Sequence, residues 1–228
     1  MSQYLHISFA RSLLSMLLLS APLHAASLQA ELRDSQGQPL ANAVLSLRST
    51  VSAPTVPATA IMDQRSQQFA PNVLAVRSGT SVAFPNSDNI RHHVYSFSPA
   101  KRFELRLYQG TPSEPVIFDT PGVVVLGCNI HDWMLGYVYV TDDPWFAVSD
   151  ERGRLNLEQL PAGAYTASLW HPQAPDMLPQ ALGELQLAEG GNQQRFTLAM
   201  QAPVIQARPS APISAFGDAF KKARDAAQ

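Results

Sequence analysis

Residues 123–140, VVVLGCNIHDWMLGYVYV, decide the fold of this chain. Their two ends are rich in β-branched and aromatic residues with glycine beside them, which predicts two strands joined by a short loop. The loop holds Cys128, the only cysteine of the chain, together with His131 and Met134 in a C-x2-H-x2-M spacing. A loop between two strands can direct all three side chains at one point.

A thiolate, an imidazole and a thioether form a soft, mixed ligand set that suits copper, whereas structural zinc prefers more thiolates. The His₂Cys core of an electron-transfer copper site needs a second imidazole from elsewhere, and the candidates are His92 and His93. Neighbouring residues of a strand face opposite sides, so only one of the pair can face the site. Taken singly, Cys128 could be a small buried hydrophobe and Met134 a core residue.

The whole segment from Ile61 to Thr141 has the same β-rich composition. Its short β-rich runs are separated by Gly and Pro turns, and this pattern predicts a small all-β sandwich. Seven runs are predicted as strands: Val73–Val76, Ser81–Phe84, His93–Phe97, Phe103–Leu107, Val116–Phe118, Val123–Leu126 and Gly136–Val140.

Three stretches of this segment, IMDQRSQQFAPNVLAVRSGTSVAFPNSD, RHHVYSFSP and GCNIHDWMLGYVYV, resemble the cupredoxins, and the short loop is similar to that of amicyanins. The segment also resembles plastocyanin-like proteins often labelled methylamine utilization proteins. The resemblance implies a Greek-key β-sandwich with one type 1 copper ion, acting as a periplasmic one-electron carrier and not as an enzyme. It assigns His92 as the upstream ligand, Cys128 as the thiolate, His131 as the second imidazole and Met134 as the long axial ligand. His93 stands where cupredoxins commonly have asparagine, and it leaves the tuning of the site open.

The exposed edge of His131 is the expected port for electrons, flanked by Trp133 and Leu135, although Trp133 could instead pack in the core. The expected partners are redox proteins, and the sequence does not identify them. Two other functions stay open: copper delivery or sensing, and a structural or binding role with an empty site. Copper enzymes of the oxidase or nitrite reductase kind need further histidine clusters. His6 and His24 are expected to leave with a signal peptide (residues 1–25), so only His93 and His171 are left over.

Two flanking stretches, residues 28–49 (LQAELRDSQGQPLANAVLSLRS) and 148–172 (VSDERGRLNLEQLPAGAYTASLWHP), resemble successive parts of a carboxypeptidase regulatory-like, transthyretin-like β-sandwich. We therefore predict a discontinuous outer β-domain, residues 27–50 plus 142–200, with the cupredoxin domain (61–141) inserted in it. Two unrelated hairpins are the alternative. Within the first stretch, Leu28–Arg33 and Ala43–Arg48 are predicted to pair as a hairpin.

The remaining segments and the composition set further limits. The 11-residue apolar run Leu13–Leu23 is too short to span a bilayer, so residues 1–25 are predicted to be a signal peptide cleaved near Ala25, with an uncleaved anchor as the alternative. Ser49–Ala60 is predicted to be a linker, and residues 201–228 a Pro/Ala-rich tail. A net charge of −2 with no basic run argues against nucleic-acid binding, and one cysteine excludes an intrachain disulfide. No stable membrane insertion is expected.

Overall fold

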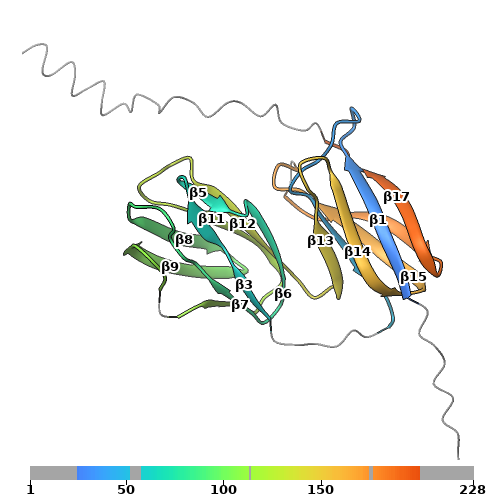
Figure 1. Ribbon diagram of the computed structural model, residues 1–228, viewed down its shortest axis with the longest axis horizontal. Helices are drawn as coiled ribbons and strands as arrows, with labels where there is room; N and C mark the ends of the chain where they lie inside the picture. The colour runs from blue at the N-terminus through green and yellow to red at the C-terminus, as the bar shows by residue number, and fades with distance from the viewer. Residues whose placement is uncertain (1–24, 52–57, 113, 175–176, 201–228) are drawn as a thin grey trace, which may run out of the picture.

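The computed structural model describes residues 25–51, 58–112, 114–174 and 177–200, which form two β-sandwiches side by side (Figure 1). The predicted all-β fold class is confirmed. Among the described residues, no helix has the length and apolar character needed to cross a bilayer. The predicted signal peptide up to residue 24 and the predicted tail lie outside the described residues.

Seventeen strands make up the described part of the chain, and they separate into two groups. We call the group that carries the predicted ligands the site-bearing sandwich: β3 (Thr59–Ile61), β4 (Asp63–Arg65), β5 (Gln68–Ala70), β6 (Val73–Arg77), β7 (Thr80–Ala83), β8 (His92–Ser98), β9 (Lys101–Tyr108), β10 (Val116–Phe118), β11 (Gly122–Gly127) and β12 (Leu135–Thr141). The other group is the flanking sandwich: β1 (Ala25–Arg33), β2 (Val44–Arg48), β13 (Trp145–Val148), β14 (Arg154–Pro161), β15 (Gly163–Trp170), β16 (Gln180–Leu187) and β17 (Gly190–Thr197).

The site-bearing sandwich packs a five-stranded sheet, in the order β6-β12-β11-β8-β9, over the three-stranded sheet β10-β7-β3, with β4 and β5 pairing beside them. Its core is rich in aromatic and β-branched side chains, including Phe84, Phe118 and Val94. All seven predicted strands of this segment are present. The short strands β3, β4 and β5 were not predicted, because their three-residue sequences TAI, DQR and QFA contain polar residues, unlike the equally short but apolar VIF of β10.

The flanking sandwich consists of the sheets β14-β1-β17 and β13-β2-β15-β16. Strands from before and after the site-bearing sandwich therefore share both sheets, with β1 between β14 and β17, and β2 between β13 and β15. Alternate residues of β1 point inward, among them Leu28 and Leu32, and they meet Leu45 and Leu47 of β2 in one aliphatic core. The likeness of this part to carboxypeptidase regulatory-like domains stays a prediction.

The predicted hairpin of residues 28–33 and 43–48 is wrong. β1 and β2 belong to opposite sheets, and the segment between them crosses from one sheet to the other. Both strands carry an apolar inner face, and that face meets a core in either arrangement. The pairing is decided by the other strands, since β1 lies between β14 and β17, and β2 between β13 and β15. The predicted linker is also too long at its end, because Thr59 and Ala60 belong to β3, which pairs with β7.

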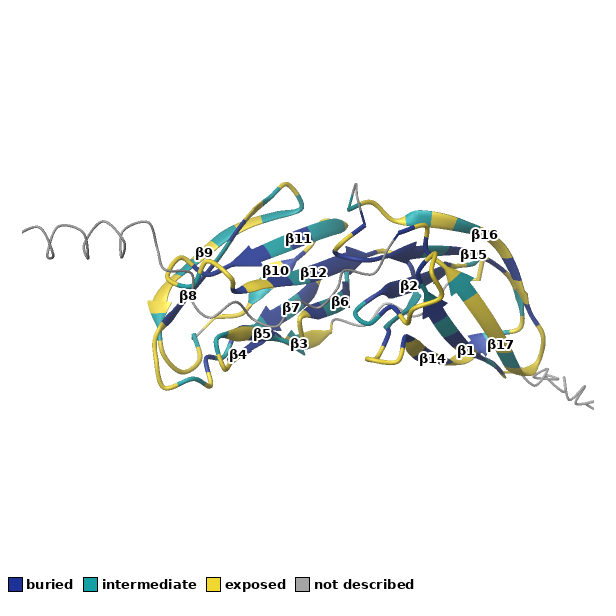
Figure 2. Cartoon of the chain, turned by 90° about the horizontal axis from the view of Figure 1, so that it is seen from above, coloured by how far each residue is buried: buried dark blue, intermediate teal, exposed yellow. Residues whose placement is uncertain are grey.

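The two sandwiches meet in a small apolar cluster of their own. Trp170 of the flanking sandwich is fully buried. It packs with Val44 of its own sandwich and with Tyr139 and Val73 of the site-bearing sandwich. Its indole N–H donates to the carbonyl of Met177 at 3.0 Å, so the polar edge of the ring is satisfied. Figure 2 shows the buried stretches of β12 and β15 approaching each other where the sandwiches join.

Candidate metal centre

Three of the four predicted ligands lie together at one end of the site-bearing sandwich. His92 is the first residue of β8, and Cys128 and His131 lie in the loop between β11 and β12. The Nδ1 atom of His92 is 3.8 Å from Cys128 Sγ, and the Nδ1 atom of His131 is 3.7 Å from the same sulfur. One ligand atom from each residue lies within 4.8 Å of the other two.

These separations match those of a metal centre. With metal–nitrogen bonds of about 2.0 Å and metal–sulfur bonds of about 2.3 Å, a tetrahedral to trigonal arrangement places nitrogen and sulfur roughly 3.5–3.7 Å apart. Both imidazoles approach the sulfur with the same ring atom, Nδ1, as two ligands sharing a metal with the thiolate would. Cys128 is 3% exposed, so the thiol would be shielded from oxidants and solvent.

The His92 ring is completely buried and is held from its far side. Its Nε2 atom lies 2.7 Å from Asp88 Oδ2. Burial pushes the pKa of Asp88 up, but N–H donors from Gln67, His92 and Ser66 push it down further, so the pKa of this carboxyl lies below its ordinary value. The ionised carboxylate accepts a hydrogen bond from the Nε2–H group, which leaves the Nδ1 lone pair of His92 facing the sulfur.

His93 faces away from this cluster. Its Nε2 atom lies 3.0 Å from Glu104 Oε1, and its ring packs edge-on against Tyr95. A bulge between His92 and Val94 shifts the pairing of β8 with β9 at this point. The structure therefore brings His92, and not His93, to Cys128.

The ligand loop is tightened by its own backbone. The N–H of Met134 donates to the carbonyl of His131 at 2.9 Å, and the N–H of Leu135 donates to that of Trp133 at 3.1 Å. Met134 is 1% exposed and packs in the same apolar cluster as Cys128. The thioether of Met134, which follows Cys128 and His131 in the chain, therefore lies inside the sandwich.

His131 occupies the boundary between the buried site and solvent. Its ring packs against Trp133 and against His92, with ring centres 5.3 and 5.0 Å apart. Burial, helped by the neighbouring His92, holds the pKa of His131 below its ordinary value, which favours the neutral imidazole that a metal needs. Trp133 is 41% exposed and Leu135 is 47% exposed, so the indole is not a core residue.

Sequence reasoning missed three features of the site. One is the carboxylate of Asp88, whose four-residue spacing from His92 gives no signal in a loop of unknown shape. Another is Gly127, where a Cβ atom would come within 2.8 Å of the Tyr95 ring. The third is Ile130, which adds a further exposed apolar side chain beside His131. Burial and side-chain direction decide each of these features, and both depend on the tertiary structure.

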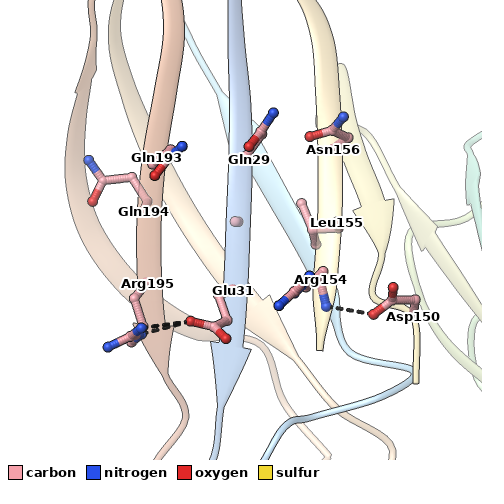
Figure 3. A pocket seen from close by; sticks show the side chains of 10 residues that line it. Gln29, Glu31, Asp150, Arg154, Leu155, Asn156, Gln193, Gln194 and Arg195 are labelled. Atoms are coloured by element: carbon pink, nitrogen blue, oxygen red, sulfur yellow. Dashed lines mark hydrogen bonds and ion pairs between the residues drawn. The ribbon is translucent and has the colours of Figure 1, made fainter. Parts of the chain in front are cut away.

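A second hollow lies far from this cluster, on the outer face of the sheet β14-β1-β17 (Figure 3). Amide and charged side chains line it. Glu31 forms an ion pair with Arg195 at 2.8 Å, and Asp150 accepts the backbone N–H of Arg154 at 2.8 Å. It contains no cysteine or histidine and therefore offers no soft metal ligands.

No protein-family model matches the chain, and no curated protein matches it in sequence. Several solved structures are similar in part. A purple cupredoxin from Nitrosopumilus maritimus is 23% identical with a TM-score of 0.32, over 37% of this chain and 99% of that one. A mutant amicyanin is 16% identical with a TM-score of 0.33, over 44% and 99%.

A copper-containing nitrite reductase from Thermus scotoductus is 24% identical with a TM-score of 0.34, over 49% of this chain. The present chain spans only 28% of that enzyme's length. All these TM-scores are below 0.5, so the similarities carry no weight for the site, whose chemistry rests on the geometry of its own residues.

Proposed function

We propose that this protein is a one-electron carrier that holds a single type 1 copper ion with His92, Cys128 and His131, and with Met134 as a weak axial ligand. The observation that carries the proposal is the approach of two imidazole Nδ1 atoms to one buried cysteine sulfur, at 3.7 and 3.8 Å. A His₂Cys set with a nearby thioether is the donor combination of blue-copper electron-transfer sites.

Bound copper would supply one-electron chemistry between Cu(I) and Cu(II). The chain's contribution is to hold its ligands still, since a small change in geometry between the two oxidation states favours rapid electron transfer. His92 is fixed by Asp88 on one side, and Cys128 follows directly on β11, whose residues Val124 and Leu126 are fully buried in the core. Ligands fixed to a packed sheet have little freedom to rearrange.

The half-exposed His131 is proposed as the route by which electrons enter and leave. It is the ligand nearest to solvent, because His92 is fully buried and Cys128 almost so. The apolar side chains of Ile130, Trp133 and Leu135 surround the histidine in the sequence and are all more than 40% exposed. A partner could exclude water from these apolar side chains on docking, and the exposed carboxylate of Asp132 is the charged group of this stretch.

A periplasmic location, reached through the predicted signal peptide, and a redox protein as partner complete the proposal. Export would place the lone Cys128 in an oxidising compartment, where thiols tend to pair. Copper ligation and burial would together protect it. A role in methylamine oxidation rests only on a family label, and none of the described site residues has the character of an amine-binding site.

Titration of the purified protein with Cu(II), followed by visible absorption, tests the proposal. We expect an intense thiolate-to-copper band that saturates at one equivalent and disappears on reduction. Copper bound without this band would contradict a type 1 site and favour a delivery or sensing role. Absence of copper binding would indicate a structural or binding β-protein with an empty site.

A further inference from the structure

We propose that Asp88 is the positioning residue of this metal centre, fixing the tautomer and orientation of His92 and placing a negative charge behind it. The inference rests on the proposed function, since it concerns one ligand of the copper site. It extends that function by naming the group that sets the donor strength of the buried imidazole. The carboxylate does not face the sulfur and is not itself a ligand.

The first observation is the position of the His92 ring between two partners. Asp88 Oδ2 lies 2.7 Å from Nε2, while Cys128 Sγ lies 3.8 Å from Nδ1, and the ring is 0% exposed. A neutral imidazole carries one proton, and a carboxylate only accepts hydrogen bonds. The proton therefore resides on Nε2, and the lone pair on Nδ1 points into the site.

The second observation is the way the carboxylate is held. The backbone N–H groups of Ser66 and Gln67, in the turn between β4 and β5, donate to its two oxygens at 2.6 and 2.9 Å. Both residues have positive φ, 53° and 58°. Two successive N–H groups in left-handed backbone form a concave anion-binding site. Turns of this kind favour Asn-Gly, so Ser-Gln adopts the conformation at a cost that the bound carboxylate offsets.

The third observation is that Asn86 fixes the backbone on which Asp88 sits. Its amide nitrogen donates to the carbonyls of Ile90 and Tyr108 at 2.8 and 3.0 Å, and its side-chain oxygen accepts the N–H of Asp88 at 3.0 Å. Asn86 is 5% exposed, so these bonds are shielded from water. The carboxylate is thus fixed from its own loop and from a neighbouring turn, and it cannot follow a ring that rotates.

The two imidazoles of the site are consequently unequal. His131 is held by contacts with the rings of Trp133 and His92, whereas His92 donates to an anion. A carboxylate that accepts the far N–H of a metal-bound imidazole raises the basicity of that ligand. A more basic and more negatively charged donor set favours Cu(II) over Cu(I), so Asp88 is expected to lower the reduction potential.

Two substitutions separate the effect of Asp88 on the His92 tautomer from the effect of its negative charge. Asp88→Ala removes the acceptor, and Asp88→Asn keeps a hydrogen-bonding side chain of the same size without the charge. Asp119→Asn is the matched control, because this carboxylate belongs to the same sandwich, is 65% exposed and pairs only weakly with Lys101 at 3.5 Å. Far-UV circular dichroism and urea unfolding establish that each variant is folded.

The first measurement needs no copper. Nitrogen-15 NMR of the histidine rings in the metal-free full chain should show His92 with its proton on Nε2 alone. In Asp88→Ala that single state should give way to a mixture of tautomers, and Asp119→Asn should match the wild type. A protonated Nδ1 in the wild type, or an unchanged His92 spectrum in a folded Asp88→Ala protein, would overturn the proposal.

The second measurement uses the copper-loaded protein. Asp88→Asn should keep the thiolate-to-copper band but bind Cu(II) about 10- to 100-fold more weakly, the usual cost of losing such a partner. Its Cu(I) affinity should change less. Each tenfold difference between the two effects raises the reduction potential by about 59 mV. An unchanged potential and affinity in folded Asp88→Asn, or an equal shift in Asp119→Asn, would contradict the role of the charge.

The two proposals fail in different ways. If His92 shows the expected tautomer and loses it in Asp88→Ala, but no copper band forms, the one-electron carrier is wrong while the positioning role of Asp88 stands. If the copper band forms but the His92 tautomer and the reduction potential are the same in the Asp88 variants as in the wild type, the copper site stands and the positioning role is wrong.

Discussion

The two sandwiches are built from the same kind of strand, yet they bury different side chains for different purposes. The flanking sandwich has an aliphatic core dominated by leucine and alanine, and its single histidine, His171, is bonded only to backbone. The site-bearing sandwich has a core of Phe, Val and Met that includes the predicted ligands Cys128 and Met134. The difference shows that one strand architecture can fill its core with aliphatic side chains or hold a cluster of nitrogen and sulfur donor atoms at one end.

The comparison predicts that the copper chemistry depends on one sandwich alone. Cys128→Ser should abolish the thiolate-to-copper band completely, because a serine hydroxyl is not ionised at neutral pH and is a poor ligand for copper in such a site. Visible absorption of the copper-treated protein measures the effect. The unfolding of the flanking sandwich, followed by hydrogen exchange of its strands, should be unchanged. Any remaining band in the serine variant would disprove the site assignment.

Replacement of a glycine in the flanking sandwich should cause the largest decrease in the free energy of unfolding. At Gly153, where φ is +72°, a Cβ atom would lie 2.4 Å from the carbonyl oxygen of Leu32. Left-handed backbone costs roughly 1–2 kcal/mol for an L-residue and the clash adds to it, so Gly153→Ala should lower the free energy of unfolding by about 3 kcal/mol. Urea denaturation measures this change.

Gly37→Ala is the control, since its φ is +80° but no atom lies within 4 Å of the added Cβ. It should cost only about 1 kcal/mol. Equal losses in the two variants would show that the clash at Gly153 is relieved at no cost. The copper band should persist in both proteins, because neither glycine belongs to the site-bearing sandwich.

The corresponding test in the site-bearing sandwich is Gly136→Ala. An added Cβ would lie 2.7 Å from the side chain of Phe69, which is 2% exposed and has little room to move. Overpacking of this kind should cost about 2 kcal/mol in urea denaturation. Because Gly136 follows the ligand loop by two residues, the copper band should also shift or broaden. Gly191→Ala, with open space around it, should leave both properties unchanged.

A smaller change is expected from Met134→Gln. The amide oxygen of glutamine is a harder donor than a thioether and favours Cu(II), while the three stronger ligands stay in place. We therefore expect the copper band to be retained and the reduction potential to fall, as measured by redox titration. A higher or an unchanged reduction potential would remove Met134 from the ligand set and leave it as a core residue.

The smallest effect concerns pH and the flanking sandwich. Burial, only partly opposed by the hydrogen bond to Ala41, holds the pKa of His171 below its ordinary value. The neutral ring donates through Nε2 to that carbonyl at 3.1 Å and accepts the N–H of Gln173 at 3.1 Å. A protonated ring could not accept that second bond.

The unfolded chain binds this proton at a pH of about 6.5, and the folded chain binds it only at lower pH. The stability that neutral His171 provides is therefore complete above about pH 6.5 and decreases as the pH falls toward the folded-state pKa. Urea midpoints from pH 7.5 to 5 should decline more steeply for the wild type than for His171→Gln. Parallel curves would show that His171 does not titrate on unfolding.

Local sequence was sufficient to predict many of the strands of this protein and the loop that groups its unusual side chains. The periodic runs between residues 73 and 140 predicted seven strands, and the unusual grouping of Cys128, His131 and Met134 in one loop indicated a soft metal site. Scarcity helped, since one cysteine leaves a single choice of thiolate. These features depend on side-chain chemistry and on neighbours within a few residues, which the sequence states directly.

Tertiary structure decided the rest, because the deciding contacts join residues far apart in the chain. The inner faces of β1 and β2 look the same whether the strands form a hairpin or oppose each other, and only the shared sheets with β13–β17 distinguish the two. Likewise, the pair His92-His93 is symmetric in the sequence. The bulge in β8 and the carboxylate of Asp88 determine which ring faces Cys128, since side-chain direction in a sheet depends on register, which is set by the neighbouring strands.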